Sequence, residues 1–169
     1  MTPSLLAESL PPIWQALESS TIGAAVRESL WLFPAIETLH LLGMALLVIT
    51  IAAFDLRLLG LALRANRIDD LAARLLPWAW AGFAIQVITG LLLFCSEASK
   101  MAVNPAFRLK MVLIALAGLH ALLFRLTASR RIAQAHLEAD TPFLARLAGL
   151  TSLALWVAVV AAGRWIGFI

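Results

Sequence analysis

Two histidines lie inside long apolar stretches of the sequence, where ionisable side chains are rare. His40 lies in the stretch from Trp31 to Gly60, and His120 lies in the stretch at about 106–126. By insertion scales an ionisable group costs roughly 2.5–3.5 kcal/mol at the centre of a bilayer, so a spanning helix that keeps one usually has a use for it. Neutral imidazoles on two facing helices can ligate both axial positions of a haem iron. The two histidines therefore predict a haem b between the first and third apolar stretches.

The haem propionates would need cations at the same end of the helices. Arg108, Lys110 and Arg164 are all expected at that end, where a basic side chain can form charge-assisted hydrogen bonds with carboxylates. The alternative for these three residues is ordinary snorkelling of long basic side chains to the membrane surface. For the two histidines, the alternative is a hydrogen bond between helices without any cofactor.

Glu37, His40 and Met44 form a second candidate metal site. Residues spaced three and four apart lie on the same face of a helix, so the three side chains can converge. A carboxylate, an imidazole and a thioether could bind copper, because soft methionine suits the reduced ion. Alternatively, Glu37 could hydrogen-bond the second ring nitrogen of His40, or it could pair with Arg164.

The composition is that of an integral membrane protein, whose surroundings are a lipid bilayer. Of the 169 residues, 62% are hydrophobic, and the mean hydropathy is +0.93. The net charge is +3, but the basic residues are spread over short connections, so we expect no nucleic-acid partner. The single cysteine, Cys95, excludes an internal disulfide.

We predict an all-α fold, an up-down membrane four-helix bundle over residues 31–169. Its spans are expected at about 32–54, 75–94, 106–126 and 143–163. Residues 1–30 are expected to form an N-terminal amphipathic segment on the membrane surface, because apolar residues recur there at helical spacing. Asn104-Pro105 is a stop and restart signal before the third span, and His136 is expected at the surface of the third connection.

The basic residues also predict an orientation. The first and third connections and their flanks hold eight: Arg57, Arg64, Arg67, Arg74, Arg125, Arg130, Arg131 and Arg146. The opposite side holds five: Arg27, Lys100, Arg108, Lys110 and Arg164. Since Lys and Arg favour cytoplasmic flanks, we expect both termini outside the cytoplasm, with the chain in a bacterial inner membrane.

Several short motifs carry a family resemblance. They are the first-helix His40, Asp-Leu-Arg-Leu-Leu-Gly at 55–60, a Trp-rich second helix ending Gly-Leu-Leu-Leu-Phe, Asn-Pro-x-Phe-x-x-Lys at 104–110, and Gly163-Arg164. With these motifs the chain resembles an uncharacterised family of small bacterial four-span membrane proteins. In organisation it is also similar to the membrane domain of copper resistance D proteins and to haem-binding protoporphyrinogen oxidases of the HemJ type. The HemJ resemblance implies a haem ligated by His40.

The leading hypothesis is therefore a membrane-embedded b-type haem protein in electron transfer or other redox chemistry. An enzyme of this kind would be a haem-dependent membrane oxidoreductase whose partner is a quinone or a redox protein. Two alternatives remain: a copper- or metal-handling membrane protein, and a non-catalytic anchoring subunit of a larger membrane complex or homo-oligomer.

Overall fold

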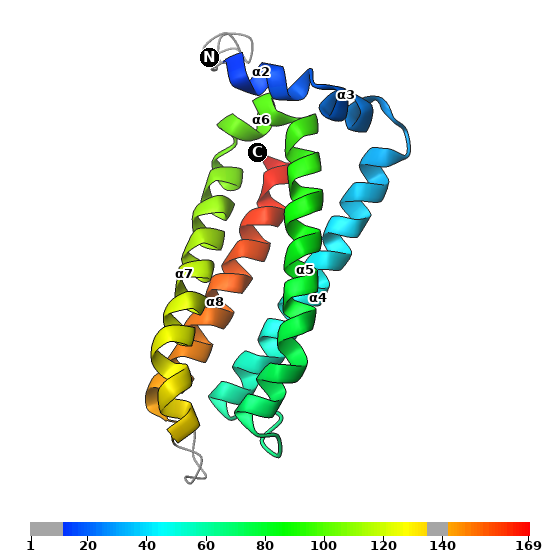
Figure 1. Cartoon of the computed structure of the whole chain (residues 1–169). Helices are drawn as coiled ribbons and strands as arrows, with labels where there is room; N and C mark the ends of the chain where they lie inside the picture. Colours follow the sequence, from blue (N-terminus) through cyan, green and yellow to red (C-terminus); the bar gives the residue numbers. More distant parts are fainter. Residues whose placement is uncertain (1–11, 135–141) are drawn as a thin grey trace.

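The computed structural model of the chain is a bundle of four long helices with short helices across one end (Figure 1). It describes residues 12–134 and 142–169, so His136 and the first part of the predicted N-terminal segment lie outside the described residues. The long helices are α4 (Leu32–Leu59), α5 (Ile68–Ser96), α7 (Pro105–Gln134) and α8 (Phe143–Trp165). The short helices are α2 (Pro12–Glu18), α3 (Thr21–Glu28), α6 (Ala98–Val103) and the 3₁₀ helix η1 (Ile166–Phe168). The described part contains no strand, so the all-α prediction is confirmed.

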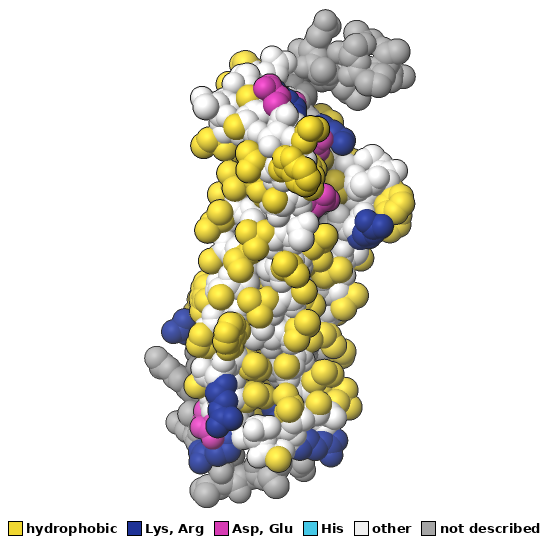
Figure 2. Space-filling view, turned by 90° about the vertical axis from the view of Figure 1, so that its right-hand side faces the viewer, with side chains coloured by type: hydrophobic (Ala, Val, Ile, Leu, Met, Phe, Trp, Pro, Cys, Tyr) yellow, Lys and Arg dark blue, Asp and Glu magenta, His cyan; other side chains and the backbone are white. Residues whose placement is uncertain are grey.

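All four long helices are long and apolar enough to cross a membrane. The most apolar window of each helix has a mean hydropathy of 1.7–2.1, and at most 22% of any window is buried inside the chain. Most apolar side chains therefore face outward, as lipid-facing side chains do. Figure 2 shows hydrophobic side chains over the body of the molecule, with Lys and Arg side chains mainly at the end away from α2 and α3 and others near the opposite end. This pattern is that of a multi-pass membrane protein.

We call one end of the bundle the basic end, where α4 and α7 finish and where α5 and α8 begin. The opposite end is the α2 end. The helices run alternately up and down between them (Figure 1). Helix α4 packs against both α5 and α8, and α7 packs against α8. Helix α7 meets α5 through stacked Phe94 and Phe107 near the α2 end, and it meets α4 through Phe54 and Phe124 near the basic end.

The contact between α4 and α5 is close because small residues lie in it. The buried residues of α5 include Gly82, Thr89 and Ser96, which are spaced seven apart. A methyl group at Gly82 would lie 2.8 Å from the backbone nitrogen of Leu47 on α4, so the two backbones nearly touch. A seven-residue repeat of small and apolar residues is typical of helices that pack at a shallow angle.

Two local motifs end and restart the helices. Gly60 adopts a left-handed conformation (φ 70°), and the N–H of Leu61 donates to the carbonyl of Leu56 at 3.0 Å, which is a Schellman end for α4. At the start of α7, the Asn104 side chain accepts from the N–H groups of Ala106 and Phe107 at 2.9 and 3.1 Å. The stop and restart signal at Asn104 is therefore confirmed.

In the described part of the N-terminal amphipathic segment, residues 12–30, the chain forms the two helices α2 and α3. The chain breaks at Ser20, whose hydroxyl accepts from the N–H of Gly23 and begins α3. A methyl group at Gly23 would lie 2.7 Å from the carbonyl oxygen of Cys95, so α3 lies directly on the end of α5. Glu18 adds a second link, because its carboxylate accepts from the N–H of Ser99 at 3.2 Å. Together α2 and α3 form a layer across the α2 end.

Candidate functional site

His40 lies half-buried on α4, about two turns from the α2 end, and it faces α5. Its Nδ1 is 2.8 Å from the hydroxyl oxygen of Thr89, which is 2% exposed. The ring lies over Gly90, where an added Cβ would be 3.2 Å from the ring carbon Cε1. The side chain amide of Gln86 also donates to the backbone carbonyl of His40. One face of α5 therefore fixes both the ring and the backbone of His40.

The hydrogen-bond network assigns the tautomer of this ring. The Thr89 hydroxyl has a single hydrogen, and it donates that hydrogen to the carbonyl of Ile85 at 2.5 Å. The bond between Thr89 and His40 must then be donated by the ring, from Nδ1–H. In a neutral imidazole this leaves Nε2 with its lone pair available. His40 is thus oriented as histidines that bind metals are, with one nitrogen donating to the protein and the other free to accept.

Lys110 approaches the same site from α7. Its side chain is half-buried and lies along α8, where a Cβ at Gly163 would be 3.6 Å from Cδ, Cε and Nζ. Its charge acts on the His40 ring. Among the described residues the ammonium has neither a hydrogen bond nor an ion pair. We call His40, Thr89, Gly90 and Lys110, with Gly163, the His40 site, to which all four long helices contribute.

The other two predicted propionate partners are exposed and have contacts elsewhere. Arg108 is exposed, and its Nε donates to the carbonyl of Ala102 at 2.9 Å. Arg164 is also exposed, with its guanidinium carbon 5.4 Å from the centroid of the Phe168 ring. Of the three cations, Lys110 is therefore the one whose side chain lies within the bundle, against Gly163 of α8.

His120 lies on α7 at a different depth from His40. At the α2 end Phe94 of α5 stacks on Phe107 of α7, with ring centroids 5.4 Å apart. Gly90 lies one turn from Phe94 toward the basic end, and Lys110 lies about one turn from Phe107 in the same direction, so Gly90 and Lys110 are level. His40 lies on Gly90, and His120 is ten residues beyond Lys110, or about 15 Å further along the helix.

The aromatic contact at the basic end indicates the same difference in depth between His120 and His40. The rings of Phe54 and Phe124 are 6.2 Å apart, which makes His120 level with Thr50, again ten residues from His40. His120 is half-buried and has no hydrogen-bond partner among residues 12–134 and 142–169. The structure does not bring the two rings level, and a haem shared by both remains a prediction from sequence.

The alternative site of Glu37, His40 and Met44 is only partly assembled. Glu37 is exposed one turn above His40, and Met44 is half-buried one turn below it. Nδ1 of His40 is hydrogen-bonded to Thr89, whereas the sequence analysis offered Glu37 as a partner for a ring nitrogen of His40. The part of the chain that the structure describes holds no group of three His, Cys, Asp or Glu side chains arranged for a metal ion.

Thr89 was missed by sequence reasoning, although a signal was present. Gln86 and Thr89 are three residues apart on α5, and both lie on the face that carries Gly82 and Ser96. Threonine in a membrane helix is easily dismissed, because it commonly bonds its own preceding turn. Thr89 does this and also receives a bond from His40.

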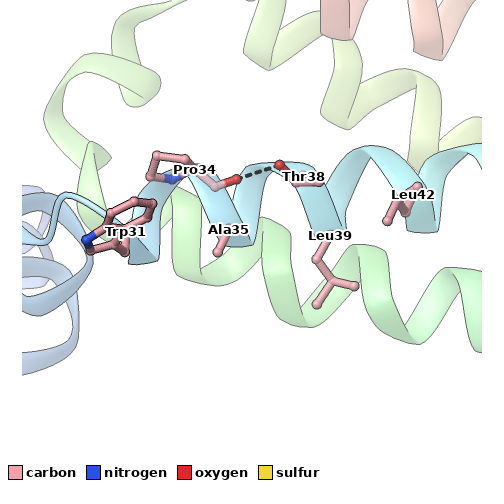
Figure 3. Close-up of a pocket in the computed structure, with 6 residues that line it drawn as sticks. All are labelled: Trp31, Pro34, Ala35, Thr38, Leu39 and Leu42. Atoms are coloured by element: carbon pink, nitrogen blue, oxygen red, sulfur yellow. Dashed lines mark hydrogen bonds between the residues drawn. The ribbon is translucent and has the colours of Figure 1, made fainter.

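A shallow hollow on the outer face of α4 lies near the His40 site but does not open into it. Figure 3 shows its lining: Trp31, Pro34, Ala35, Thr38, Leu39 and Leu42. The Thr38 hydroxyl in it donates to the carbonyl of Pro34 at 2.7 Å, within the same helix. The hollow is an apolar surface without a group that could bind or react, which is suited to contact with lipid.

The chain is similar to one protein family over most of its length. The family model of DUF6644, a family of unknown function, matches residues 21–169. The chain therefore belongs to the DUF6644 family. No curated protein and no solved structure matches it. The expected likeness to a family of unknown function is supported, whereas the likeness to copper resistance D and HemJ-type proteins is not.

Proposed function

We propose that this member of the DUF6644 family is a membrane-embedded b-type haem protein that takes part in electron transfer. The His40 site would hold the haem, with Nε2 of His40 on the iron and Lys110 toward a propionate. The observation that carries the proposal is the orientation of His40, whose Nδ1–H is donated to Thr89 so that Nε2 remains available.

Lys110 supports an anionic and mainly apolar ligand at the same site. An ammonium held half-buried among apolar helices without an ion pair is costly, and an anion beside it relieves that cost. Haem b combines two carboxylates with a large apolar ring. One carboxylate beside Lys110 and iron at His40 would satisfy both polar groups of the site.

A bound haem would supply one-electron redox chemistry, and the residues of this chain would hold it and tune it. Thr89 fixes the tautomer and the plane of the His40 ring. The surrounding apolar helices exclude water, which affects the reduction potential of a bound iron. Because His120 lies about 15 Å deeper, the proposal assigns His40 alone to the iron.

The proposed setting is a bacterial inner membrane with both termini outside the cytoplasm. The concentration of Lys and Arg at the basic end supports this orientation (Figure 2). The His40 site then lies in the outer half of the membrane, within reach of a quinone in the bilayer or a redox protein at the outer face. A haem-dependent oxidoreductase would use the same site.

The test is an absorption spectrum of the detergent-purified full-length chain, oxidised and then reduced with dithionite. We expect sharp reduced haem bands in the wild type, their loss in His40→Ala, and their retention in the matched variant His120→Ala. Loss of the bands in both variants would replace the single-histidine assignment with a pair.

Other outcomes would overturn the proposal. A colourless wild type, expressed with ample haem, would contradict it. If that protein held copper, a metal-handling function would follow. If it held neither haem nor metal and co-purified with another subunit, an anchoring role would follow.

A further inference from the structure

Asp55 is a carboxyl group buried in the helix contact at the basic end. It lies on α4 five residues before Gly60 and is 2% exposed. Opposite it on α8, a Cβ at Gly149 would lie 3.0 Å from the backbone oxygen of Asp55 and 3.0 Å from Cβ of Leu58. The backbones of α4 and α8 therefore approach closely here, which excludes water from the carboxyl group.

An apolar core cluster lies next to Asp55. Leu58 and Ala145 form the buried core cluster at this end, with Phe54, Ile68 and Phe124 packed against it. The Ser152 side chain on α8 lies close enough to the Asp55 carboxyl to interact with it. The second carboxyl oxygen, Oδ2, is buried and has no hydrogen-bond partner in the part of the chain that the structure describes.

Basic side chains are close in sequence and on the neighbouring helices, but none of the described ones forms an ion pair with Asp55. The charged groups at these helix ends include Arg57 on α4, Asp69, Asp70 and Arg74 on α5, Arg125 on α7 and Arg146 on α8, with Arg64 and Arg67 in the connection between α4 and α5. Of these, Arg57, Asp69, Arg125 and Arg146 have interactions of their own, and the Nε of Arg57 donates to the carbonyl of Asn66 at 2.8 Å. The ion pairs between described residues all lie at the α2 end.

We infer that Asp55 is a proton-binding site, which the structure holds as a neutral carboxylic acid. A buried carboxylate without a cation and with an unsatisfied oxygen is costly, whereas the neutral acid carries no charge and can both donate and accept a hydrogen bond. Ser152 can accept that donation or supply the opposite one. The step is a simple protonation: a proton from the aqueous phase at the basic end forms an O–H bond on the Asp55 carboxylate.

The residues at this position favour a proton over a metal cation. Calcium takes six to eight oxygen ligands and magnesium an octahedral set, whereas Asp55 has one hydroxyl beside it. Within the described residues no second acidic side chain, histidine or cysteine joins it in a metal-binding group. The inference does not depend on haem, because Asp55 and His40 are fifteen residues apart on α4.

Infrared spectroscopy of the full-length protein in detergent tests the inference. We expect a carboxylic acid C=O stretching band at neutral pH that shifts when aspartate is labelled with ¹³C at its side-chain carboxyl. The band should be lost in Asp55→Asn and retained in Asp70→Asn, since Asp70 is an exposed carboxylate at the same end. Asparagine resembles the neutral acid in shape, so Asp55→Asn should fold.

Ser152→Ala provides an independent readout if Asp55→Asn does not fold. Removing the hydroxyl should change the frequency of the band without abolishing it, because a group that can hydrogen-bond the carboxyl is lost. A label-sensitive acid band that is absent at neutral pH, or that persists in Asp55→Asn, would overturn the inference. So would loss of the band on adding sodium or calcium at constant pH, which would identify a cation site.

Discussion

At the scale of single residues, the chemistry of the site depends on which nitrogen of His40 carries the hydrogen. Thr89 decides this, because its own hydrogen is already donated to Ile85. A sequence reveals that a histidine lies in a membrane helix, but the tautomer depends on a partner 49 residues away. The partner therefore offers the most direct test of the proposed haem site.

Replacing Thr89 by valine should weaken haem binding without abolishing it. Valine keeps the shape of threonine but cannot accept the Nδ1–H, and loss of such a supporting bond typically lowers metal affinity by about 10–100-fold. Haem titration of the purified apoprotein measures the change. Thr38→Val is the matched control, since Thr38 is exposed on α4 and bonds only Pro34 in its own helix. Equal affinities for wild type and Thr89→Val would contradict the proposed role of the bond.

Replacing Lys110 by methionine should have two opposite effects. The unbranched methionine fills similar space without the charge, so the thermal stability of the apoprotein should rise as a half-buried ammonium without an ion pair among the described residues is removed. Haem affinity should fall by roughly tenfold or more, because a hydrogen bond between charged groups contributes about 1.5–3 kcal/mol. Arg108→Met, which changes an exposed cation at the same end, should alter neither quantity. If Lys110→Met left haem affinity unchanged, Lys110 would be a snorkelling residue.

At the scale of helices, the contact between α4 and α5 positions His40 against Thr89. Gly82→Ala should disturb this contact, because the new methyl group would lie 2.8 Å from the backbone nitrogen and 3.0 Å from Cα of Leu47, neither of which can rotate away. Overpacking of this kind costs about 1–3 kcal/mol. We expect a lower midpoint of thermal unfolding in detergent for the full-length protein.

Gly118→Ala is the matched control for this prediction. It adds the same methyl group on α7, where nothing lies within 4 Å of the new Cβ. Alanine is also the better helix former, so the unfolding midpoint should not fall. Equal destabilisation by both substitutions would mean that the close approach of α4 and α5 does not limit stability.

Hydropathy located the four spans but not the ends of their helices. The predicted first span ended at residue 54, whereas α4 continues to Leu59 through Asp55 and Arg57, and α5 begins seven residues before the predicted 75. Lipid selects apolar residues, but backbone hydrogen bonding continues into polar segments until a residue such as Gly60 ends it. Helix ends therefore follow local capping, which Asn104-Pro105 signalled clearly and the other ends did not.

The candidate site could be predicted only in part for a similar reason. His40 and Lys110 were recognised because charged and ionisable residues are conspicuous in apolar segments. Their grouping depends on helix register, which the sequence does not show, since a shift of one turn moves a side chain by about 5.4 Å. Asp55 follows directly after the predicted first span, and the sequence does not show that it is buried, because its burial depends on Gly149 of a helix far along the chain.

At the scale of the whole molecule, the distribution of charge predicts the orientation. The sequence assigned eight basic residues to one side and five to the other, but Lys110 lies inside the bundle rather than in a flank. The asymmetry is therefore larger than the count suggests, and it favours a cytoplasmic basic end.

Cysteine accessibility can test this orientation in a chain whose native Cys95 has been replaced by serine. Ser19 and Ala65 are both exposed, the first in the layer across the α2 end and the second in the connection at the basic end. In spheroplasts, a membrane-impermeant thiol reagent should label Ser19→Cys fully and Ala65→Cys only after the membrane is permeabilised. The reverse pattern would put Asp55 near the outer face and the His40 site near the cytoplasm. The electron partner would then have to be a quinone or a cytoplasmic protein, and the proton bound at Asp55 would come from outside the cell membrane.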